Sequence, residues 1–205
     1  MTPIDPLVKA LGELPVSTVY ESADKQGDVA PHIRQMVPGL RLAGRAFTLK
    51  TMPGDNLGVF HAIAAAPAGS VLVIDGGDSP RVTIWGGTST IAAQARGLSG
   101  CVTNAAVRDL DQMLELRFPV YAPGTAVRGT AKNHPGWLGV PVTIGEAIVH
   151  PGDILLGDAD GLVIVAQEHA QAVYEKARER FALEQAREQR LRAGEDILSV
   201  LGLTR

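Results

Sequence analysis

Residues 71–116 read VLVIDGGDSPRVTIWGGTSTIAAQARGLSGCVTNAAVRDLDQMLEL, and the rest of the chain is interpreted around them. Residues 71–74 and 101–103 have the length and the apolar composition of buried strands. A loop follows each of these runs, and the second loop carries Arg108 and Asp109. The stretch therefore predicts a carboxylate and a guanidinium close to the end of a buried strand.

A helix is expected to begin between the two strands. Gly86-Gly87 precedes Thr88-Ser89, which are residue types that cap helices, and Gly97 stands where a helix C-terminal glycine belongs. The first amides of a helix have no partner within it and carry the positive end of its dipole. Together with the carboxylate and the guanidinium, this helix end suits a small anion bound with a metal ion.

Length and composition indicate a single globular domain, residues 1–205. Apolar residues make up 45% of the chain and charged residues 20%, which is ordinary for a globular protein. The net charge of −3 does not indicate a nucleic-acid partner. There is no basic-then-apolar leader and no long apolar run, so we expect a cytoplasmic protein that does not bind membranes. The single cysteine, Cys101, is expected to be a buried thiol.

Outward from this stretch, the pattern predicts a mixed α/β chain. Antiparallel hairpins are expected to dominate the second half, which disfavours a purely doubly wound parallel sheet. The Gly- and basic-rich segment 124–136 is expected to be irregular. Helices are expected at residues 4–14, 18–26, 57–66, 110–116 and 167–193. Strands are expected at residues 40–51 (as a strand or hairpin) and 120–122, and hairpins at 140–149 and 154–165.

The last of these helices carries an apolar stripe that includes one carboxylate. Apolar residues recur at a spacing of three or four, at Ala170, Val173, Ala177 and Phe181. Glu184 continues the same stripe. Because an unpaired buried charge is costly, either this end of the helix is exposed or Glu184 reaches a polar site, such as one on a neighbouring subunit.

Arg108-Asp109 is the sharpest local feature. In a functional interpretation, Asp109 is a hard oxygen ligand for Mg²⁺ or Mn²⁺, and Arg108 stabilises negative charge that develops on a nearby oxygen. In a structural interpretation, Asp109 only stabilises the positive end of the following helix beside a surface arginine.

Other candidates have similar alternatives. Thr88 and Ser89 are either carboxylate-binding amides or an ordinary helix cap. Asp75-Gly76-Gly77-Asp78 either lines the same site or forms a strand-end turn. The five histidines lack metal-binding spacing, although His134 in the Gly-rich segment is a candidate for a position near the site.

The segment that contains Arg108 and Asp109 resembles a known family. The segment Gly97-x-x-Gly100-x-Val102-x-x-Ala105-x-Val107-Arg108-Asp109 resembles the signature of the RraA-like superfamily. That superfamily includes the class II 4-hydroxy-4-methyl-2-oxoglutarate aldolases and the regulator of ribonuclease E activity A. The resemblance implies an αββα sandwich assembled as a trimer or a dimer of trimers. Further matches lie at Gly54-Asp55-Asn56-Leu57, residues 38–48, Asp75-Gly76-Gly77, Pro141-Val142-Thr143 and residues 151–161.

The resemblance also implies a catalytic site between subunits. Asp109 would bind a divalent metal, Mg²⁺ or Mn²⁺ or another, and Arg108 would contact the keto oxygen of the substrate. Gly87, Thr88 and Ser89, at the start of the helix, would bind the pyruvyl carboxylate through their amides.

The resemblance assigns a role to Glu184, and this chain departs from the family pattern at two positions. A glutamate on the C-terminal helix of the adjacent subunit helps to position a metal-bound water, and Glu184 matches it. The aldolases place an acidic residue twenty-two positions before the metal aspartate, where this chain has Gly87. This departure removes a group that typically contributes about 10²–10⁴-fold in rate. A second departure is Ala105, where the signature has glycine.

Two functions follow from these observations. The first is a divalent-metal-dependent lyase that acts on 2-oxo acids through a pyruvate enolate. It would catalyse retro-aldol cleavage or oxaloacetate decarboxylation, and Gly87 favours decarboxylation. The second is a non-catalytic regulator, like that of ribonuclease E, which acts by protein contact. The longer C-terminal helix and residues 54–57 favour the aldolase branch, and Gly87 disfavours it.

Overall fold

The computed structural model describes residues 5–203. Within this range a mixed sheet forms the centre of the molecule, with the strand order β1-β7-β5-β3-β2-β11-β12 and β8 paired to β2. Strands β2, β3, β5 and β7 run parallel to one another, whereas β1, β8, β11 and β12 join the sheet through antiparallel pairs. The bounds are β1 (Arg34–Gln35), β2 (Leu42–Lys50), β3 (Val71–Asp75), β5 (Gly100–Thr103), β7 (Val120–Ala122), β8 (Trp137–Leu138), β11 (Ile154–Gly157) and β12 (Leu162–Val165).

Two short ladders stand apart from this sheet. One is the antiparallel hairpin of β9 (Val142–Ile144) and β10 (Ala147–Val149). The other pairs β4 (Thr83–Trp85) with β6 (Ala106–Val107) in parallel. The mixed α/β class and both expected hairpins of the second half are therefore confirmed.

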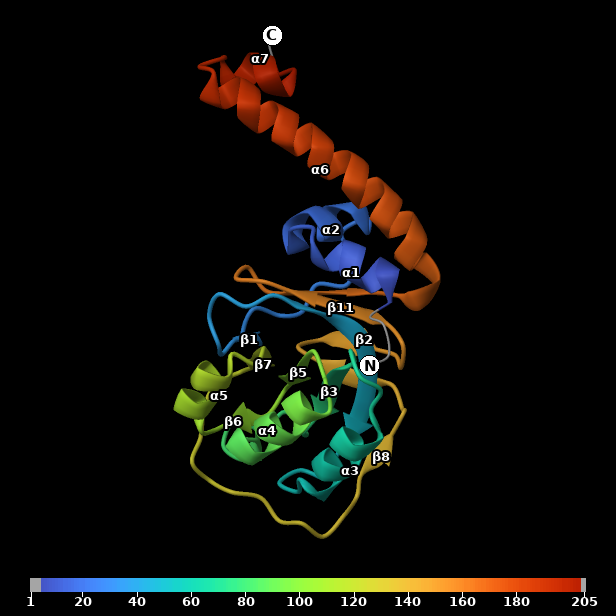
Figure 1. Ribbon diagram of the computed structural model, residues 1–205, viewed down its shortest axis with the longest axis vertical. Coiled ribbons are helices and arrows are strands. Elements are labelled where there is room, and N and C mark those ends of the chain that lie inside the picture. The colour runs from blue at the N-terminus through green and yellow to red at the C-terminus, as the bar shows by residue number, and fades with distance from the viewer. Residues whose placement is uncertain (1–4, 204–205) are drawn as a thin grey trace.

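The helices form two groups on either side of the sheet. Figure 1 shows α3, α4 and α5 together below the strands, and α1, α2 and the start of α6 stacked above β11. The bounds are α1 (Pro6–Gly12), α2 (Val16–Ser22), α3 (Leu57–Ala65), α4 (Gly87–Ala95), α5 (Leu110–Leu116), α6 (Ala170–Arg192) and α7 (Ile197–Leu201). A 3₁₀ turn, Gln167–His169, precedes α6.

Alternation along the strands distributes apolar side chains between separate clusters. In β3, Leu72 and Ile74 pack in the cluster beneath α3, α4 and α5, whereas Val71 and Val73 pack with the β9–β10 hairpin. Strands β11 and β12 give alternate residues to that hairpin cluster and to a third cluster under α1, α2 and α6. Both faces of these strands are therefore covered, which explains their unbroken apolar sequences. The Cys101 thiol is buried as expected, and burial raises its pKa.

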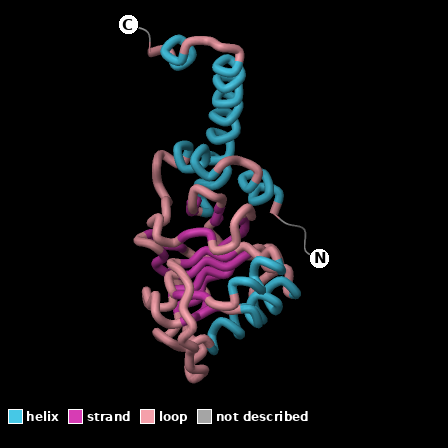
Figure 2. The backbone as a smooth tube through the Cα atoms, turned by 90° about the vertical axis from the view of Figure 1, so that its left-hand side faces the viewer, coloured by secondary structure: helices cyan, strands magenta, loops and turns pink. Residues whose placement is uncertain are grey.

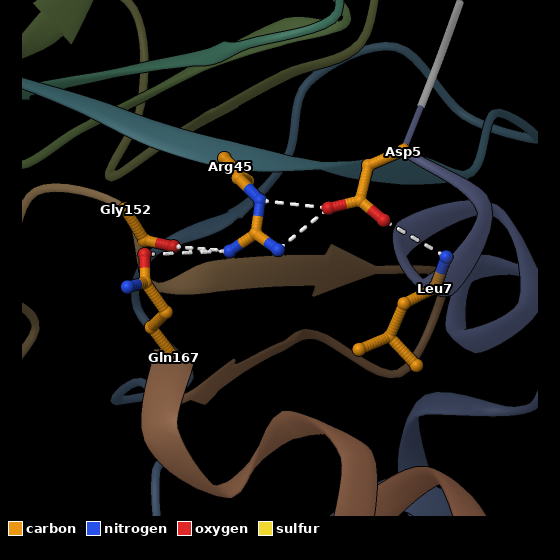
Figure 3. A network of polar contacts seen from close by, with 5 residues as sticks. All are labelled: Asp5, Leu7, Arg45, Gly152 and Gln167. Carbon is orange, nitrogen blue, oxygen red and sulfur yellow. Dashed lines mark hydrogen bonds and ion pairs between the residues drawn. The ribbon is translucent and has the colours of Figure 1, made fainter.

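A polar network ties the first helix to the sheet (Figure 3). The Asp5 carboxylate caps α1 by accepting from the Leu7 amide at 2.9 Å, and it accepts a second hydrogen bond from Arg45 Nε at 2.9 Å. Arg45 Nη1 donates to the carbonyl oxygen of Gly152 at 3.0 Å. The hydrogen bond from Arg45 holds the pKa of Asp5 below its ordinary value.

Helix α6 extends well beyond the body of the protein. Figure 2 shows it as a single rod that carries the C-terminal segment away from the strands. The predicted stripe is confirmed in its first half, where Ala170, Val173 and Ala177 are buried and Phe181 packs against them. Further along, Leu183 is 60% exposed. No helix within residues 5–203 combines the length and the apolar character that a bilayer crossing requires.

Several expected boundaries were wrong. Helix α2 begins at Val16 and ends at Ser22, because Asp24 and Lys25 adopt positive φ values that a helix cannot include. Of the two alternatives expected for residues 40–51, the single strand is confirmed, and it covers residues 42–50. The expected first helix reached residue 4, which lies outside the described residues. The pattern missed β1, β4, β6, β8 and α7, which are all short.

Candidate active site

The β4–β6 ladder brings the two candidate loops together. Trp85 pairs with Val107, so the residues that follow them, Gly86 and Arg108, lie side by side. The Arg108 amide donates to the carbonyl oxygen of Trp85 at 3.1 Å. The predicted meeting of a helix N-terminus with the Arg108-Asp109 pair is therefore present, and β4 and β6 produce it.

Asp109 lies at the junction of these loops. Its backbone is left-handed, with φ 61°, and it immediately precedes α5. Its Oδ2 atom accepts a hydrogen bond from the Gly87 amide at 3.0 Å and lies 3.8 Å from Arg108 Nε. Both side chains are 48% exposed, so the carboxylate is fixed on one side and open to solvent on the other.

Gly86 makes room for this carboxylate. A Cβ atom at residue 86 would lie 2.8 Å from Asp109 Oδ2 and 3.4 Å from Arg108 Cγ. Because the backbone of Gly86 is extended (φ −157°), the requirement for glycine is steric rather than conformational.

Helix α4 presents its N-terminus to the same place. It begins at Gly87, one residue before the expected Thr88, so the Thr88 and Ser89 amides belong to its first turn. A buried contact braces this turn, because Trp85 Nε1 donates to Thr90 Oγ1 at 2.9 Å and that hydroxyl donates to the carbonyl oxygen of Gly86 at 3.1 Å. The positive end of the helix dipole is thus held next to Arg108.

A hollow of about 180 Å³ opens at this junction. Two basic side chains line it, those of Arg108 and Lys132. Asn56 also lines it, and the buried Oδ1 atom of this residue has no hydrogen-bond partner among residues 5–203. The two cations and the N-terminus of α4 outweigh the charge of Asp109, the one carboxylate in the lining. The hollow therefore suits a small, negatively charged molecule. The other lining residues are Phe60, Thr83, Ile84, Trp85, Gly86, Thr88, Ser89, Asp109 and Thr130.

Asp55 holds the loop that carries Lys132. Its buried carboxylate accepts from the amides of Leu57, Asn133 and His134 at 3.0, 2.7 and 3.1 Å. Burial alone would raise the pKa of Asp55, but these three hydrogen bonds outweigh it and leave the pKa below its ordinary value. Lys132 Nζ lies 5.8 Å from the centroid of the Phe60 ring. The sequence pattern does not single out Lys132 or Asn56, although segment 124–136 is basic and residues 54–57 match the family.

The donor set limits which metal sites are feasible. Within residues 5–203 no three His, Cys, Asp or Glu side chains cluster as a set of metal ligands. Asp109 is thus a single protein carboxylate at an open hollow, which fits a hard cation that keeps most of its water ligands. Mg²⁺ and Mn²⁺ meet this description, whereas a structural zinc site with four protein ligands does not.

Two earlier candidates lie outside the hollow. Asp75 Oδ1 accepts from the Gly77 amide and from Asn104 Nδ2, which agrees with a strand-end turn. His134 Nδ1 accepts from the Gly136 amide at 2.9 Å, so its imidazole stabilises its own loop. Ala105 is buried and packs against Gly76, in the same turn.

Glu184 is far from Asp109 within one chain. Its carboxylate accepts from Thr18 Oγ1 and from Arg180 Nε, each at 2.8 Å. Figure 1 shows α6, which carries it, on the opposite side of the sheet from α4 and α5. A role for Glu184 at the site of a neighbouring subunit stays a prediction.

Comparison with known proteins identifies the class. The family model RraA-like, described as Aldolase/RraA, matches residues 16–164, and the chain belongs to this family. The match includes every residue that lines the hollow.

Among the similar proteins, one is named as an aldolase, one as an inhibitor of RNA processing, and one is described as uncharacterized. A protein of Thermus thermophilus named 4-hydroxy-4-methyl-2-oxoglutarate aldolase is 33% identical over 143 residues, which are 69% of this chain and 87% of that protein. The solved structure of the RNA-processing inhibitor RraA from Thermus thermophilis is 29% identical, with a TM-score of 0.69, and covers 74% of this chain and 92% of that one. An uncharacterized protein from Pseudomonas syringae pv. tomato has a TM-score of 0.88 at 28% identity and covers 99% and 96% of the two chains.

Proposed function

We propose that this protein is a divalent-metal-dependent lyase that acts on small 2-oxo acids and releases pyruvate. The observation that carries the proposal is the junction at Asp109, where a half-exposed carboxylate, the Arg108 guanidinium and the N-terminus of α4 border one small hollow. The aldolase name of the Thermus thermophilus relative supports the same class of reaction.

In this proposal, the protein groups divide the substrate between them. The Thr88 and Ser89 amides bind the carboxylate next to the keto group, because they lie in the first turn of α4 and have no hydrogen-bond partner within that helix. Arg108 donates to the keto oxygen and stabilises the negative charge that this oxygen acquires when the carbon–carbon bond breaks. Lys132, on the facing loop, is placed to bind a second carboxylate.

Asp109 would hold the cation. The bound cation would act as a Lewis acid on the keto group. The Gly87 amide fixes Asp109 Oδ2 from one side, and Gly86 leaves this carboxylate free of steric contact.

Decarboxylation of oxaloacetate fits this site better than retro-aldol cleavage. Retro-aldol cleavage requires a group that removes the proton of the 4-hydroxyl, and residue 87 is glycine, which has no side chain to do so. Decarboxylation requires no such group, because the departing carboxylate already carries its negative charge.

The proposal includes a homo-oligomer, a trimer or a dimer of trimers. Beyond Phe181, the segment that runs through the end of α6 and α7 to residue 203 exposes several large apolar side chains to solvent, as expected of a segment that contacts another subunit. Such a contact would bring Glu184 to the site of the neighbour. Sedimentation at several protein concentrations tests this assembly, and a monomer at all of them would contradict it. The exposed residues are Leu183, Leu191, Ile197, Leu198, Leu201 and Leu203.

The test of the function is pyruvate release from oxaloacetate and from 4-hydroxy-4-methyl-2-oxoglutarate in the presence of Mg²⁺. The rate with Mg²⁺ alone is subtracted, and the wild type is compared with Asp109→Ala and Arg108→Lys. We expect Asp109→Ala to lose more than about 100-fold in rate, and Arg108→Lys to lose less because it keeps the charge but not the planar fork. Equal rates in the wild type and Asp109→Ala would contradict the metal role.

The likeness to the RNA-processing inhibitor supports a second candidate, a regulator that acts by protein contact. Calorimetry with Mg²⁺ and oxalate, a stable analogue of the 2-oxo acid group, separates the two. Binding would support the lyase, and the lack of binding would favour the regulator.

A further inference from the structure

The space beside Gly87 is filled by a residue from another helix. A Cβ atom at residue 87 would lie 1.6 Å from Gln112 Oε1 and 2.7 Å from Gln112 Cδ. The same point is 3.4 Å from the Cβ atom of Asp109. The carboxamide of Gln112 therefore occupies the position beside Asp109 where a side chain at residue 87 would be.

The local structure explains why Gln112 is the residue that reaches this position. It is the third residue of α5, and Asp109 immediately precedes this helix. Helices α4 and α5 are neighbours, and Asp109 already contacts the first residue of α4 through the Gly87 amide. Because Gly87 has no side chain, Gln112 can lie directly on the backbone of that first turn.

A carboxamide has a defined chemical consequence here. It donates and accepts hydrogen bonds, but unlike a carboxylate or an imidazole it does not exchange a proton near neutral pH. At this position next to Asp109, the Gln112 side chain can therefore orient a bound group but cannot act as an acid or a base.

The two reactions considered for this site differ in their need for a base. In decarboxylation of a 3-carboxy-2-oxo acid, the bond between C3 and the carboxylate breaks, CO₂ leaves, and the electron pair moves onto C3 and the keto oxygen. Water then supplies a proton to C3, and no proton is taken from the substrate. In retro-aldol cleavage, the 4-hydroxyl must give up its proton as the bond between C3 and C4 breaks.

We propose that Gln112 is a specificity-determining residue, which makes the site favour decarboxylation of 3-carboxy-2-oxo acids over cleavage of 4-hydroxy-2-oxo acids. This inference rests on the proposed lyase function. The lyase proposal attributes the selectivity to the lack of a side chain at residue 87. This inference adds a second cause, the Gln112 side chain of α5, which occupies the space beside Gly87.

The test compares the wild type with Gln112→Glu and Gln112→His, which place a proton-exchanging group at the same position. Oxaloacetate and 4-hydroxy-4-methyl-2-oxoglutarate both carry two carboxylates, so a new charge at residue 112 affects their binding similarly, and this effect cancels in the ratio of their kcat/KM values. We expect this ratio, cleavage over decarboxylation, to rise at least about tenfold in Gln112→Glu, with a new ionisation in the pH profile of cleavage. Gln26→Glu, an exposed change of the same chemistry remote from Asp109, is the control and should leave the ratio unchanged.

The outcomes separate this inference from the lyase proposal. An unchanged ratio and pH profile in both Gln112 variants, while the wild type still releases pyruvate, would overturn the role of Gln112 alone. If the wild type releases no pyruvate from either substrate above the Mg²⁺ background, the lyase function fails and the inference falls with it. Gln112 is exposed, and thermal melts of both variants verify that they fold.

Discussion

Replacing Gly86 by alanine should misplace the carboxylate of Asp109 without removing it. The added Cβ would lie 2.8 Å from Asp109 Oδ2, whereas an ordinary carbon–oxygen contact is about 3.3 Å or more. The carboxylate must therefore move by about half an ångström. Such a movement stretches its 3.0 Å hydrogen bond from the Gly87 amide to about the limit of a normal bond.

Two consequences can be given a magnitude. A hydrogen bond to a charged group is worth about 1.5–3 kcal/mol, and we expect a loss of only about 1 kcal/mol in the free energy of unfolding because Asp109 is half exposed. A misplacement of this size at a catalytic group costs on the order of 10–100-fold in rate. The two effects together would make Gly86→Ala a folded protein with poor metal-dependent activity.

The assay is the Mg²⁺ concentration that gives half-maximal pyruvate release, together with a thermal melt. Gly129→Ala is the control, because its Cβ would lie 3.4 Å from Arg108 Nη1, at the edge of ordinary contact, and would not come within 4 Å of Asp109. We expect Gly86→Ala to need at least about tenfold more Mg²⁺, and Gly129→Ala to match the wild type. The same Mg²⁺ dependence in Gly86→Ala and the wild type would refute the reasoning.

Three further predictions concern the supports of the site and the sheet. Asp55→Asn should lower the free energy of unfolding by about 2 kcal/mol at pH 7, because the carboxylate accepts three amide hydrogen bonds. The pKa of Asp55 is lowered by folding, so its contribution is present above the unfolded pKa of about 3.9 and is lost as the pH falls through the folded value. Denaturant titrations between pH 3 and 7 should show this loss in the wild type, and an equally steep pH dependence in Asp55→Asn would contradict it. Arg45→Met should cost about 1 kcal/mol by breaking the partly exposed pair with Asp5, and an unchanged melting temperature would argue against the network of Figure 3. Lys132→Met should raise KM for oxaloacetate about tenfold or more and weaken the salt dependence of KM; unchanged steady-state constants would exclude Lys132 from the binding of the second carboxylate.

Local signals were sufficient to predict much of the fold. The buried strands at residues 71–74 and 101–103, the helix that ends before Gly97 and the stripe on α6 depend on periodicity and capping, which act within a few residues. The same signals failed where an element is held by distant partners. Strands β4 and β6 are very short and exist because they pair with each other, and the sequence of neither one indicates this pairing.

The candidate site was predictable to the same extent. Arg108, Asp109, Thr88 and Ser89 were found because each stands next to a recognisable strand end or helix start. Lys132 was missed because the loop that carries it is positioned through Asp55, more than seventy residues earlier in the chain.

The contact between Gln112 and Gly87 was also beyond the reach of the pattern. It depends on how α5 packs beside α4, and that packing leaves no mark in the sequence of either helix. Contacts of this kind, between a side chain of one helix and the backbone of another, require coordinates.

Titration of oxalate into the wild type and into Asp109→Asn, each with and without Mg²⁺, tests most directly whether Asp109 anchors a cation that binds the 2-oxo acid group. Asn keeps the size of the side chain and removes its charge, so the fold is preserved. We predict that Mg²⁺ strengthens oxalate binding to the wild type, and that Asp109→Asn loses this enhancement by about 100-fold or more. Oxalate binding that is independent of Mg²⁺, or equally dependent on it in both proteins, would contradict the role of Asp109.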